Sequence, residues 1–363
     1  MNRGLFPAGV EAQSFQSYPI GLMNMNAYES AKRLLKQEPK SWLVTGVAGF
    51  IGSNLLEYLL KLEQKVIGLD NFSSGRESCL AEVRRLVTPN QWKNFKFVLG
   101  DICDKDVCQR LCESVDFVLH HAALSSVPQS LDNPIATNET NVGGFLNMLK
   151  ASYECGVKRF VYASSSAIYG DFIGLPNTEA DIGSPLSPYA VSKRANELYA
   201  EAFARSYGFK SIGLRYFNVF GKRQNPNSSY AAVIPRWISA MSAGEQVHIY
   251  GDGKTTRDFC YVENIVQANV LAASTPNILA MGEIFNIATG VETSLNELHG
   301  FLENLMNRRV ENFQPCRPIY LDFRAGDIKY SVAAIDKSKE LLGYEPTHTV
   351  LSGLEEIMLN GVD

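Results

Sequence analysis

The stretch SWLVTGVAGFIGSN, residues 41–54, decides the fold. Its first five residues are mostly apolar or β-branched and predict a short buried strand. Three glycines follow at Gly46, Gly49 and Gly52, and apolar residues then recur at helical spacing. A strand that turns through glycines into a helix directs unpaired backbone N–H groups at one point, which suits a pyrophosphate. The stretch therefore predicts a dinucleotide-binding turn, although a tight packing turn also uses glycines.

An acidic residue at the end of the next predicted strand indicates which dinucleotide binds. A second apolar run, residues 65–69, leads into Asp70, 18 residues after Gly52. A carboxylate at this place holds the ribose hydroxyls of NAD and repels the 2′-phosphate of NADP. The glycine spacing G-x-x-G-x-x-G resembles that of the extended short-chain dehydrogenases. We therefore expect NAD as the cofactor.

Composition and charge limit the classes of protein to be considered. The chain has 363 residues, of which 45% are hydrophobic and 20% charged, and its net charge is −4. This length suits one large α/β domain and a smaller one. Because no cluster of five or six basic residues occurs, we expect no nucleic-acid partner. No apolar run approaches the ~20 residues of a membrane span and no signal segment is evident, so a cytoplasmic protein without membrane contact is expected.

The cysteines and histidines predict no metal site. Seven cysteines are scattered without a C-x-x-C pair, which suits free thiols in a reducing compartment. Cys108 and Cys112 lie one helical turn apart, but two thiols without nearby histidines make a poor metal site. The five histidines are dispersed. We therefore expect no metal.

The order of the predicted elements indicates an α/β fold with a Rossmann-type, doubly wound parallel sheet. Strands are predicted at residues 41–45, 65–69, 95–99, 116–120 and 159–163, with helical patterns between them. The expected division is an N-terminal extension with a short helix at 1–40, an NAD-binding domain at 41–217 and a smaller substrate domain at 218–363. Part of the third division is expected to return to the sheet. Within the first, residues 1–24 are expected to be flexible and residues 25–36 helical.

Polar and small residues follow several predicted strands, where open α/β sheets bind their ligands. Asp101 follows the third strand and is either a ligand contact or a cap for the helix that starts near Asp104. A helix is expected from residue 138 to residue 155, and Asn138 and Asn141 at its start are each either a helix cap or a cofactor contact. His121 ends the fourth strand, and the two alanines after it leave room for a cofactor. These positions extend the predicted cofactor site along the strand ends.

A tyrosine and a lysine carry the predicted chemistry. Ser187 and Pro188 are helix-start signals, so Tyr189 and Lys193 share one face of the helix that follows. A free tyrosine has a pKa of about 10, which a nearby ammonium and a nicotinamide cation lower by about 1–3 units per close charge. The alternative is a packed tyrosine beside a solvated lysine, because this spacing is frequent by chance. Hydroxyls at residues 164–166, after the fifth strand, favour hydride transfer at a secondary alcohol.

Seven ordered motifs resemble the UDP-hexose 4-epimerase family over residues 40–360. They are GVAGFIG at 46–52, GLDN at 68–71, GDI at 100–102, HAA at 121–123, SSSAIYG at 164–170, SPYAVSK at 187–193 and RYFNVFG at 215–221. The resemblance implies that Tyr189 takes the proton of the sugar's 4-hydroxyl while the C4 hydride passes to NAD. Lys193 then tunes Tyr189, and Ser165 hydrogen-bonds the developing oxyanion. The 4-keto sugar turns over and takes the hydride back on its other face, so NAD stays bound.

The resemblance also implies the remaining contacts. For the cofactor they are Gly46, Gly49, Phe50, Ile51, Gly52, Asp70, Asn71, Ser74, Gly75, Asp101, Ile102, His121, Ala122, Ala123, Asn141, Tyr189, Lys193 and Tyr216. For a UDP-sugar they are Ser125, Ser126, Ser165, Ser166, Tyr189, Asn218, Val233, Tyr250, Arg257, Arg324, Asp327 and Ser331. Tyr250 packs against uracil, and Arg257 and Arg324 clamp the diphosphate through their forked guanidinium groups. Taken singly, each arginine is more commonly part of a surface ion pair.

A size argument addresses the sugar. In the family, the side chain four residues after the Asp of a Gly-Asp-Ile motif walls the C2 substituent, and here it is Ser331, after Asp327. A tyrosine there leaves room only for a hydroxyl, whereas serine leaves space for an N-acetyl group. The chain thus resembles the branch that prefers UDP-GlcNAc and UDP-GalNAc. It departs from that branch at His121, Ser125 and Gln129, where the branch has Gln, Gly and Arg.

We therefore expect a UDP-N-acetylhexosamine 4-epimerase that serves polysaccharide biosynthesis. Dehydration is disfavoured, because dehydratase relatives carry Thr-Asp-Glu where this chain has Ser165, Ser166 and Ala167. The alternatives are a UDP-glucose or UDP-glucuronate 4-epimerase and a UDP-glucuronate decarboxylase. From other classes, a non-catalytic NAD-binding sensor and a net NAD-consuming reductase are considered. The family commonly dimerises through the Tyr189 helix and the helix before it, so a homodimer is expected.

Overall fold

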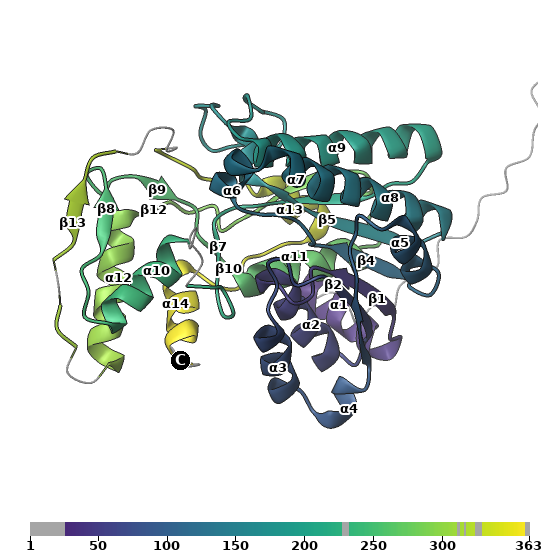
Figure 1. Ribbon diagram of the computed structural model, residues 1–363, viewed down its shortest axis with the longest axis horizontal. Coiled ribbons are helices and arrows are strands. Elements are labelled where there is room, and N and C mark those ends of the chain that lie inside the picture. Colours follow the sequence, from purple (N-terminus) through teal and green to yellow (C-terminus); the bar gives the residue numbers. More distant parts are fainter. Residues whose placement is uncertain (1–25, 227–231, 311–312, 316, 324–328, 360–363) are drawn as a thin grey trace, which may run out of the picture.

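A seven-stranded sheet forms the centre of the computed structural model, which describes residues 26–226, 232–310, 313–315, 317–323 and 329–359 (Figure 1). In spatial order its strands are β11 (Ile284–Ile287), β6 (Ile212–Tyr216), β5 (Arg159–Ser165), β4 (Phe117–His120), β1 (Ser41–Thr45), β2 (Lys65–Asp70) and β3 (Phe95–Leu99). Every neighbouring pair is parallel. The strand order reverses between β1 and β4, and ligands bind at such a switch point. The Rossmann-type prediction is confirmed.

Helices cover both faces of this sheet (Figure 1). One layer contains α1 (Ala27–Gln37), α2 (Phe50–Lys61), α3 (Glu77–Leu86), the short α4 (Pro89–Trp92) and α11 (Val262–Ser274). The other contains α5 (Lys105–Cys112), α8 (Phe145–Glu154) and α9 (Pro188–Tyr207), with α6 (Val127–Asp132) and α7 (Pro134–Asn138) packed against α9. Each layer buries apolar side chains against the sheet, as a doubly wound fold requires.

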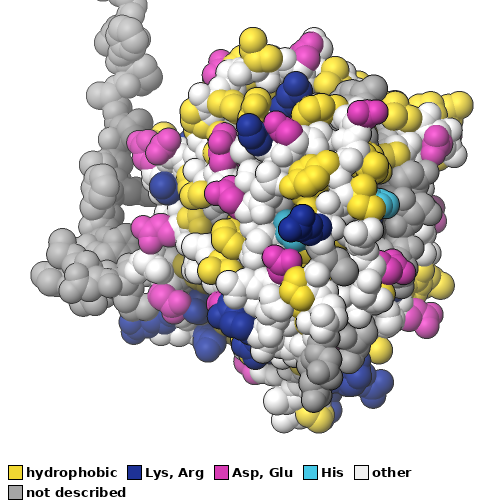
Figure 2. All heavy atoms as spheres, turned by 90° about the vertical axis from the view of Figure 1, so that its left-hand side faces the viewer, with side chains coloured by type: hydrophobic (Ala, Val, Ile, Leu, Met, Phe, Trp, Pro, Cys, Tyr) yellow, Lys and Arg dark blue, Asp and Glu magenta, His cyan; other side chains and the backbone are white. Residues whose placement is uncertain are grey.

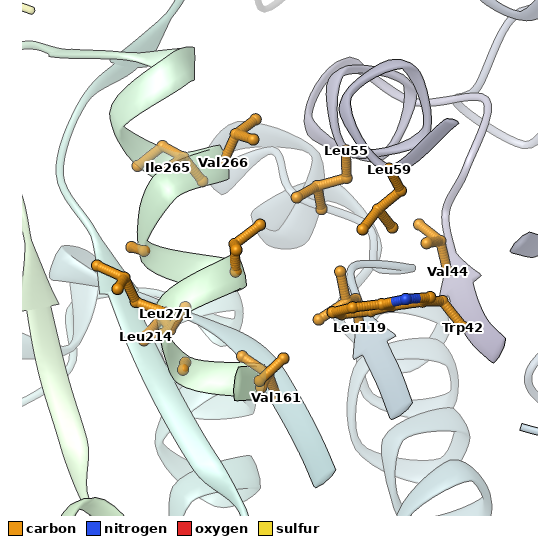
Figure 3. Close-up of a cluster of buried hydrophobic side chains, with 14 of the residues drawn as sticks. Trp42, Val44, Leu55, Leu59, Leu119, Val161, Leu214, Ile265, Val266 and Leu271 are labelled. Atoms are coloured by element: carbon orange, nitrogen blue, oxygen red, sulfur yellow. The ribbon is translucent and has the colours of Figure 1, made fainter. Parts of the chain in front are cut away.

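The core between α2, α11 and the sheet holds α2 in place (Figure 3). Leu55 and Leu59 of α2 face Trp42 and Val44 of β1, and all four side chains are fully buried. Around them lie Leu119, Val161, Leu214, Ile265, Val266 and Leu271. Burying each large apolar side chain contributes about 1.5–3 kcal/mol. The N-terminus of α2 is therefore fixed over the end of β1.

A second lobe, at the left of Figure 1, is built from residues after 217. It contains β7 (Val219–Phe220), α10 (Val233–Ser242), β8 (His248–Tyr250), β9 (Thr256–Arg257), β10 (Cys260–Tyr261), β12 (Thr293–Ser294), α12 (Leu295–Arg309), β13 (Ile319–Leu321) and α14 (Val350–Leu359). A separate hydrophobic cluster, centred on Trp237 and Leu302, fills it. In contrast, α11, the 3-10 turn η4 (Ile278–Ala280), β11 and α13 (Asp336–Leu342) pack on or beside the sheet.

The predicted elements agree closely with the observed ones, with one departure. The helix expected from residue 138 begins as a π-helical turn, η2 (Glu139–Gly144), before α8. Two glycines occupy this turn, and a Cβ on Gly144 would lie 2.5 Å from Ile102 Cδ1. The chain therefore needs glycine to approach the loop after β3. The helix expected near residues 25–36 is α1, capped by Asn26, and the extension at residues 1–24 lies outside the described residues.

The surface of the second lobe carries charges of both signs (Figure 2). Lysine, arginine and acidic side chains are spread over this face, together with single apolar side chains. Within the described ranges, no helix is both long and apolar enough to cross a membrane. The same residues include no group of three or more His, Cys, Asp or Glu side chains placed to hold a metal ion.

Candidate active site

A cavity of about 540 Å³ runs along the carboxyl ends of the central strands. Most of the predicted cofactor residues line it: Gly46, Gly49, Phe50, Ile51, Gly52, Asp70, Asn71, Ser74, Asp101, Ile102, His121, Ala122, Ala123, Tyr189, Lys193 and Tyr216. Among the predicted substrate residues, Ser125, Ser165, Ser166 and Asn218 line the same cavity. The sheet topology thus brings into one cavity predicted residues that are up to 172 positions apart, from Gly46 to Asn218.

The glycine turn after β1 fits a dinucleotide diphosphate. Gly46 has a φ of +69°, and a Cβ there would lie 2.8 Å from the backbone nitrogen of Ala122. A Cβ on Gly52 would lie 2.1 Å from the carbonyl oxygen of Gly46. Gly49 caps α2, so the free N–H groups of the first turn of this helix lie at the cavity wall. Backbone donors and the helix dipole together favour an anionic group at this point.

Two carboxylates, Asp70 and Asp101, line the cavity in fixed orientations. Asp70 accepts hydrogen bonds from the backbone nitrogens of Ala48 (2.9 Å) and Phe72 (2.8 Å), one on each oxygen. Each oxygen keeps a further lone pair for a ribose hydroxyl. Asp101 accepts from Asn71 Nδ2 at 2.8 Å. The alternative role of Asp101 as a helix cap is not observed, because Asp104 itself caps α5.

Among the predicted contacts before residue 218, three do not line the cavity. Asn141 is buried, and its amide bonds both backbone groups of Leu124 and the hydroxyl of Ser192. Gly75 lies behind Asp70, where a Cβ would be 2.8 Å from the carboxylate. Ser126 instead caps α6 by accepting from the backbone of Gln129. The structure thus gives these residues supporting contacts with the cavity wall.

The helix α9 presents the tyrosine and the lysine to the cavity. It begins at Pro188, after Ser187, whose hydroxyl accepts from the backbone of Ala190. One turn later, Lys193 is only 4% exposed, and its Nζ donates to the carbonyl oxygen of Ala163 at 2.9 Å. The same Nζ lies 5.9 Å from the centre of the Tyr189 ring. Helix register therefore places a cation beside the phenol, as the spacing predicts.

The ionisation of these groups is set chiefly by burial. Burial raises the pKa of Tyr189, and a hydrogen bond with Ser165 lowers it in part. Burial also lowers the pKa of Lys193 to about 8. Protein groups alone therefore keep the phenol protonated near neutral pH. The acidification that we expect from the sequence requires a second positive charge besides the Lys193 ammonium.

His121 forms a neutral part of the cavity wall. Its Nε2 lies 2.9 Å from the hydroxyl of Tyr216, which also accepts from Asn269. Burial lowers the pKa of His121 to about 3. A group with this pKa is uncharged at physiological pH. His121 therefore neither supplies a charge nor acts as an acid there.

A second cavity, of about 280 Å³, lies in the second lobe. Val233, Tyr250 and Arg257 line it, as predicted for the nucleotide end, together with Trp237 and other apolar side chains. Asn218 and Val219 line both cavities. The two cavities therefore adjoin at the end of β6, where an extended ligand has access to both.

The predicted diphosphate and sugar residues of the C-terminal segment are only partly within the described chain. Arg324 and Asp327 lie outside the described residues. Ser331 lines neither cavity, but its carbonyl oxygen accepts from the backbone of Asp258, which follows Arg257. The segment that carries Ser331 therefore lies beside the smaller cavity, which Arg257 lines.

Sequence reasoning missed Asp258, a buried carboxylate that joins three segments. It accepts from the backbone and hydroxyl of Thr289 and from the backbone of Gly290 and Ala333, at 2.7–3.3 Å. Burial raises its pKa, and these hydrogen bonds oppose the rise. The Asn218 amide donates to its carbonyl oxygen at 3.1 Å. The only signal in the sequence was an acid directly after Arg257.

Sequence reasoning also missed Arg223, which lines the larger cavity. Its guanidinium is buried and bonds Asn54 and Glu57 of α2 at 2.7 Å, and Glu82 of α3 at 2.8 Å. Arg76 in turn donates to its carbonyl oxygen. These bonds join the loop after β7 to the cofactor helix. Arginine in an unpatterned loop gives no sequence signal of this role.

Comparison with known proteins places this site in a family. The pattern of the NAD-dependent epimerase/dehydratase family matches residues 42–288. A UDP-glucose 4-epimerase of Mycolicibacterium smegmatis is 34% identical over 314 residues, which cover 86% of this chain and 95% of the relative.

Solved structures agree with this match. A UDP-N-acetylglucosamine 4-epimerase of Methanobrevibacter ruminantium, in complex with UDP-N-acetylmuramic acid, has 36% identity and a TM-score of 0.79, covering 88% of this chain and 97% of that one. A UDP-glucose 4-epimerase of Thermus thermophilus, in complex with NAD, has 30% identity and a TM-score of 0.75, covering 89% and 100%. The chain therefore belongs to the NAD-dependent epimerase/dehydratase family, and NAD is its cofactor.

Proposed function

We propose that this chain is a UDP-sugar 4-epimerase that retains NAD and interconverts UDP-N-acetylhexosamines. One observation carries the proposal: Tyr189, hydrogen-bonded by Ser165 and flanked by Lys193, lies in the cavity that adjoins the nucleotide cavity. Relatives that act on UDP-glucose and a solved UDP-N-acetylglucosamine 4-epimerase support the reaction class. The division into an NAD-binding part at 41–217 and a substrate part at 218–363 belongs to the same proposal.

The chain's own residues supply the proton chemistry. NAD, when bound, supplies a reversible acceptor for hydride. Tyr189 takes the proton of the sugar's 4-hydroxyl as the C4 hydride leaves and returns it when the hydride is restored. Ser165 donates a hydrogen bond to the oxygen that gains electron density, which stabilises the 4-keto intermediate. The Lys193 ammonium favours the ionised phenol.

The nucleotide end of the substrate is proposed to stay anchored while the sugar turns. Tyr250 and Val233 would hold uracil in the smaller cavity, and Arg257 would bind the diphosphate. Asn218 lines both cavities and so lies between the two ends. An anchor outside the reaction cavity leaves the hexose able to present either face to the same tyrosine.

The charges of the larger cavity favour a neutral sugar over a uronate. Among the described residues that line it, the cations are Lys193, Arg76 and Arg223. Lys193 bonds Ala163, and the two arginines bond a carbonyl oxygen and carboxylates. Among the described lining residues, no other cation is present near Ser165 to bind the C6 carboxylate of a uronate. Ser166 and Ala167 in place of an acid pair argue in the same way against dehydration.

The partner proposed for this chain is a second copy of it. Val191 and Leu198 lie seven residues apart on the same face of α9 and are 54% and 50% exposed. On α7, Ile135 is 71% exposed. An apolar stripe of this spacing suits helix pairing. The six cysteines among the described residues are free, which supports the cytoplasmic location that we propose.

The first prediction concerns the substrate. Purified protein without added cofactor should interconvert UDP-GlcNAc and UDP-GalNAc, and chromatography of the products measures this. Ser331→Tyr should lower kcat/KM for UDP-GlcNAc at least ~10-fold, because the tyrosine ring would occupy the space of the N-acetyl group. A misfit of one group in a binding pocket costs about 1–3 kcal/mol of transition-state binding. UDP-glucose turnover should persist in this variant, and Ser331→Ala is the matched control. Undiminished UDP-GlcNAc turnover by the Ser331→Tyr variant would contradict the argument that the size of residue 331 determines the sugar preference.

The second prediction concerns the base. Tyr189→Phe removes only the hydroxyl that exchanges the proton, so kcat should fall by about 10²–10⁴-fold, the usual contribution of a positioned acid–base group. Bound NAD, released by heating and quantified by chromatography, should stay at the wild-type level. Activity within tenfold of wild type would assign the base to another residue.

The third prediction concerns pH. The hydrogen bond from Ser165 lowers the pKa of Tyr189, and catalysis needs the ionised phenol. Ser165→Ala should therefore move the acid limb of the kcat/KM profile to higher pH and lower the plateau by about 10²–10³-fold, the cost of removing one oxyanion donor. Ser165→Thr keeps the hydroxyl and should keep the limb in place. An unmoved limb in Ser165→Ala would exclude the hydrogen bond as a cause.

The fourth prediction concerns assembly. Leu198→Glu places a charge in the proposed helix contact, so sedimentation should change from a dimer to a monomer. Leu34→Glu is the control, because Leu34 is 59% exposed on α1, away from α9. A wild-type monomer, or a Leu198→Glu dimer, would refute this interface.

A further inference from the structure

A buried ion pair connects the helix of the proposed base to both strands that border it. We infer that Glu197 and Arg215 are positioning residues that set the distance between Tyr189 and Ser165. The inference rests on the proposed function for its kinetic readouts but concerns residues that touch neither ligand cavity. It is carried by the contacts of the two side chains.

Glu197 lies on α9, two turns after Tyr189, and its side chain is fully buried. It accepts from Ser164 Oγ at 2.7 Å, and from Arg215 Nε and Nη2 at 2.9 and 3.0 Å. Arg194 adds a fourth bond at 3.0 Å. Ser164 belongs to β5, and Arg215 belongs to β6. A single carboxylate therefore fixes α9 against two adjacent strands.

The residues that follow Ser164 and Arg215 in the chain connect these contacts with the active site. Ser164 precedes Ser165, which hydrogen-bonds Tyr189, and Arg215 precedes Tyr216, which lines the cavity. Consecutive residues on a strand point to opposite faces. Glu197 thus holds Ser164 and Arg215, and Ser164 itself also lines the cavity. The positions of the neighbouring residues Ser165 and Tyr216 follow from those of Ser164 and Arg215.

Arg215 extends the pair toward the segment that carries Ser331. Its Nη1 donates to the hydroxyl of Tyr169 at 2.9 Å and to the carbonyl oxygen of Glu179 at 3.0 Å. The Tyr169 hydroxyl donates to Asn286 Oδ1 at 2.6 Å. The Asn286 amide then bonds the carbonyl oxygens of residues 177 and 334. The network thus has a catalytic end at Glu197 and a substrate end at Asn286.

The energetics favour a positioning role over a stabilising one. Glu197 and Arg215 are each 1% exposed, and removing two charges from water costs several kcal/mol per ion. Apolar residues of similar volume often replace such pairs without loss of stability. An apolar pair cannot reproduce the exact position and orientation of α9 relative to the strands, because dispersion contacts are less directional than four hydrogen bonds. A displacement of about 1 Å at reacting atoms costs on the order of 10²-fold in rate.

The decisive experiment replaces both charges at once. The double variant Glu197→Leu/Arg215→Met should fold and keep bound NAD and the KM for UDP-sugar within about threefold, while kcat falls at least ~10-fold. Ser164→Ala, which keeps both charges, should lower kcat to a smaller extent and in the same direction. Leu305→Ala on α12 is the control for general destabilisation, because Leu305 is buried in the other lobe, and its kcat should stay at the wild-type value.

A second measurement is independent of turnover. The ultraviolet difference titration of wild type against Tyr189→Phe isolates ionisation of the Tyr189 phenol. In Ser164→Ala and in the double variant this titration should move to higher pH, because a displaced Ser165 no longer stabilises the ionised phenol. Wild-type kcat together with an unmoved titration in Ser164→Ala would overturn the inference, whether or not the double variant folds. A moved titration in a protein that epimerises no UDP-sugar would refute only the proposed function.

The substrate end of the network has its own variant. Tyr169→Phe removes the link between Arg215 and Asn286 and leaves the Glu197 contacts in place. It should raise the KM for UDP-sugar about threefold or more with kcat unchanged, since a lost neutral hydrogen bond is worth about 0.5–1.5 kcal/mol. A fall in kcat with unchanged KM would contradict this division of the network.

Discussion

The close approach of the first turn of α2 to the turn after β1 is the constraint on which the molecule depends. Gly46 and Gly52 bring the two backbones so near that a single Cβ on Gly52 would lie 2.1 Å from a carbonyl oxygen. This approach leaves helix N–H groups free at the switch point of the sheet. The other strand ends then supply the groups that surround that point, from Asp70 to Ser165. The position of the candidate active site is thus set by the residue at which α2 begins.

Two buried carboxylates organise the two halves of the site in the same physical manner. Glu197 collects donors from two strands and its own helix, and Asp258 collects them from two later segments of the chain. A carboxylate has about four acceptor positions, so it can join several segments at one point. Such a junction specifies direction as well as proximity. Sites made from distant segments need this property more than they need added stability.

The sequence predicts the fold well because its signals are local. Hydrophobic runs, glycines and caps are all within a few residues of the elements they define, and β1, β3 and α9 form where these signals place them. Gly144, in the π-helical turn η2, lies close against Ile102, 42 positions away. No local pattern reveals such a contact.

The site is predicted less completely than the fold for a related reason. Residues that face the cavity belong to recognisable motifs, whereas the partners that orient them do not. Asn141 was expected to be either a helix cap or a cofactor contact because it lies near the start of a helical pattern, but its amide bonds Leu124 and Ser192. Arg223 and Asp258 act through long-range hydrogen bonds that only the folded chain shows. The ionisation of Tyr189 is governed by burial, which is a property of the fold.

The run of three serines after β5 has a consequence for how this protein can change in evolution. Ser164 bonds Glu197 and Ser165 bonds Tyr189, although both serines line the cavity and the two are identical in chemistry. Only the pleat of the strand distinguishes them. Insertion or deletion of one residue in β5 would exchange the two hydroxyls without changing the composition of the motif. The length of this strand is therefore as tightly constrained as the identity of its residues, while the surface loops are free to vary in length.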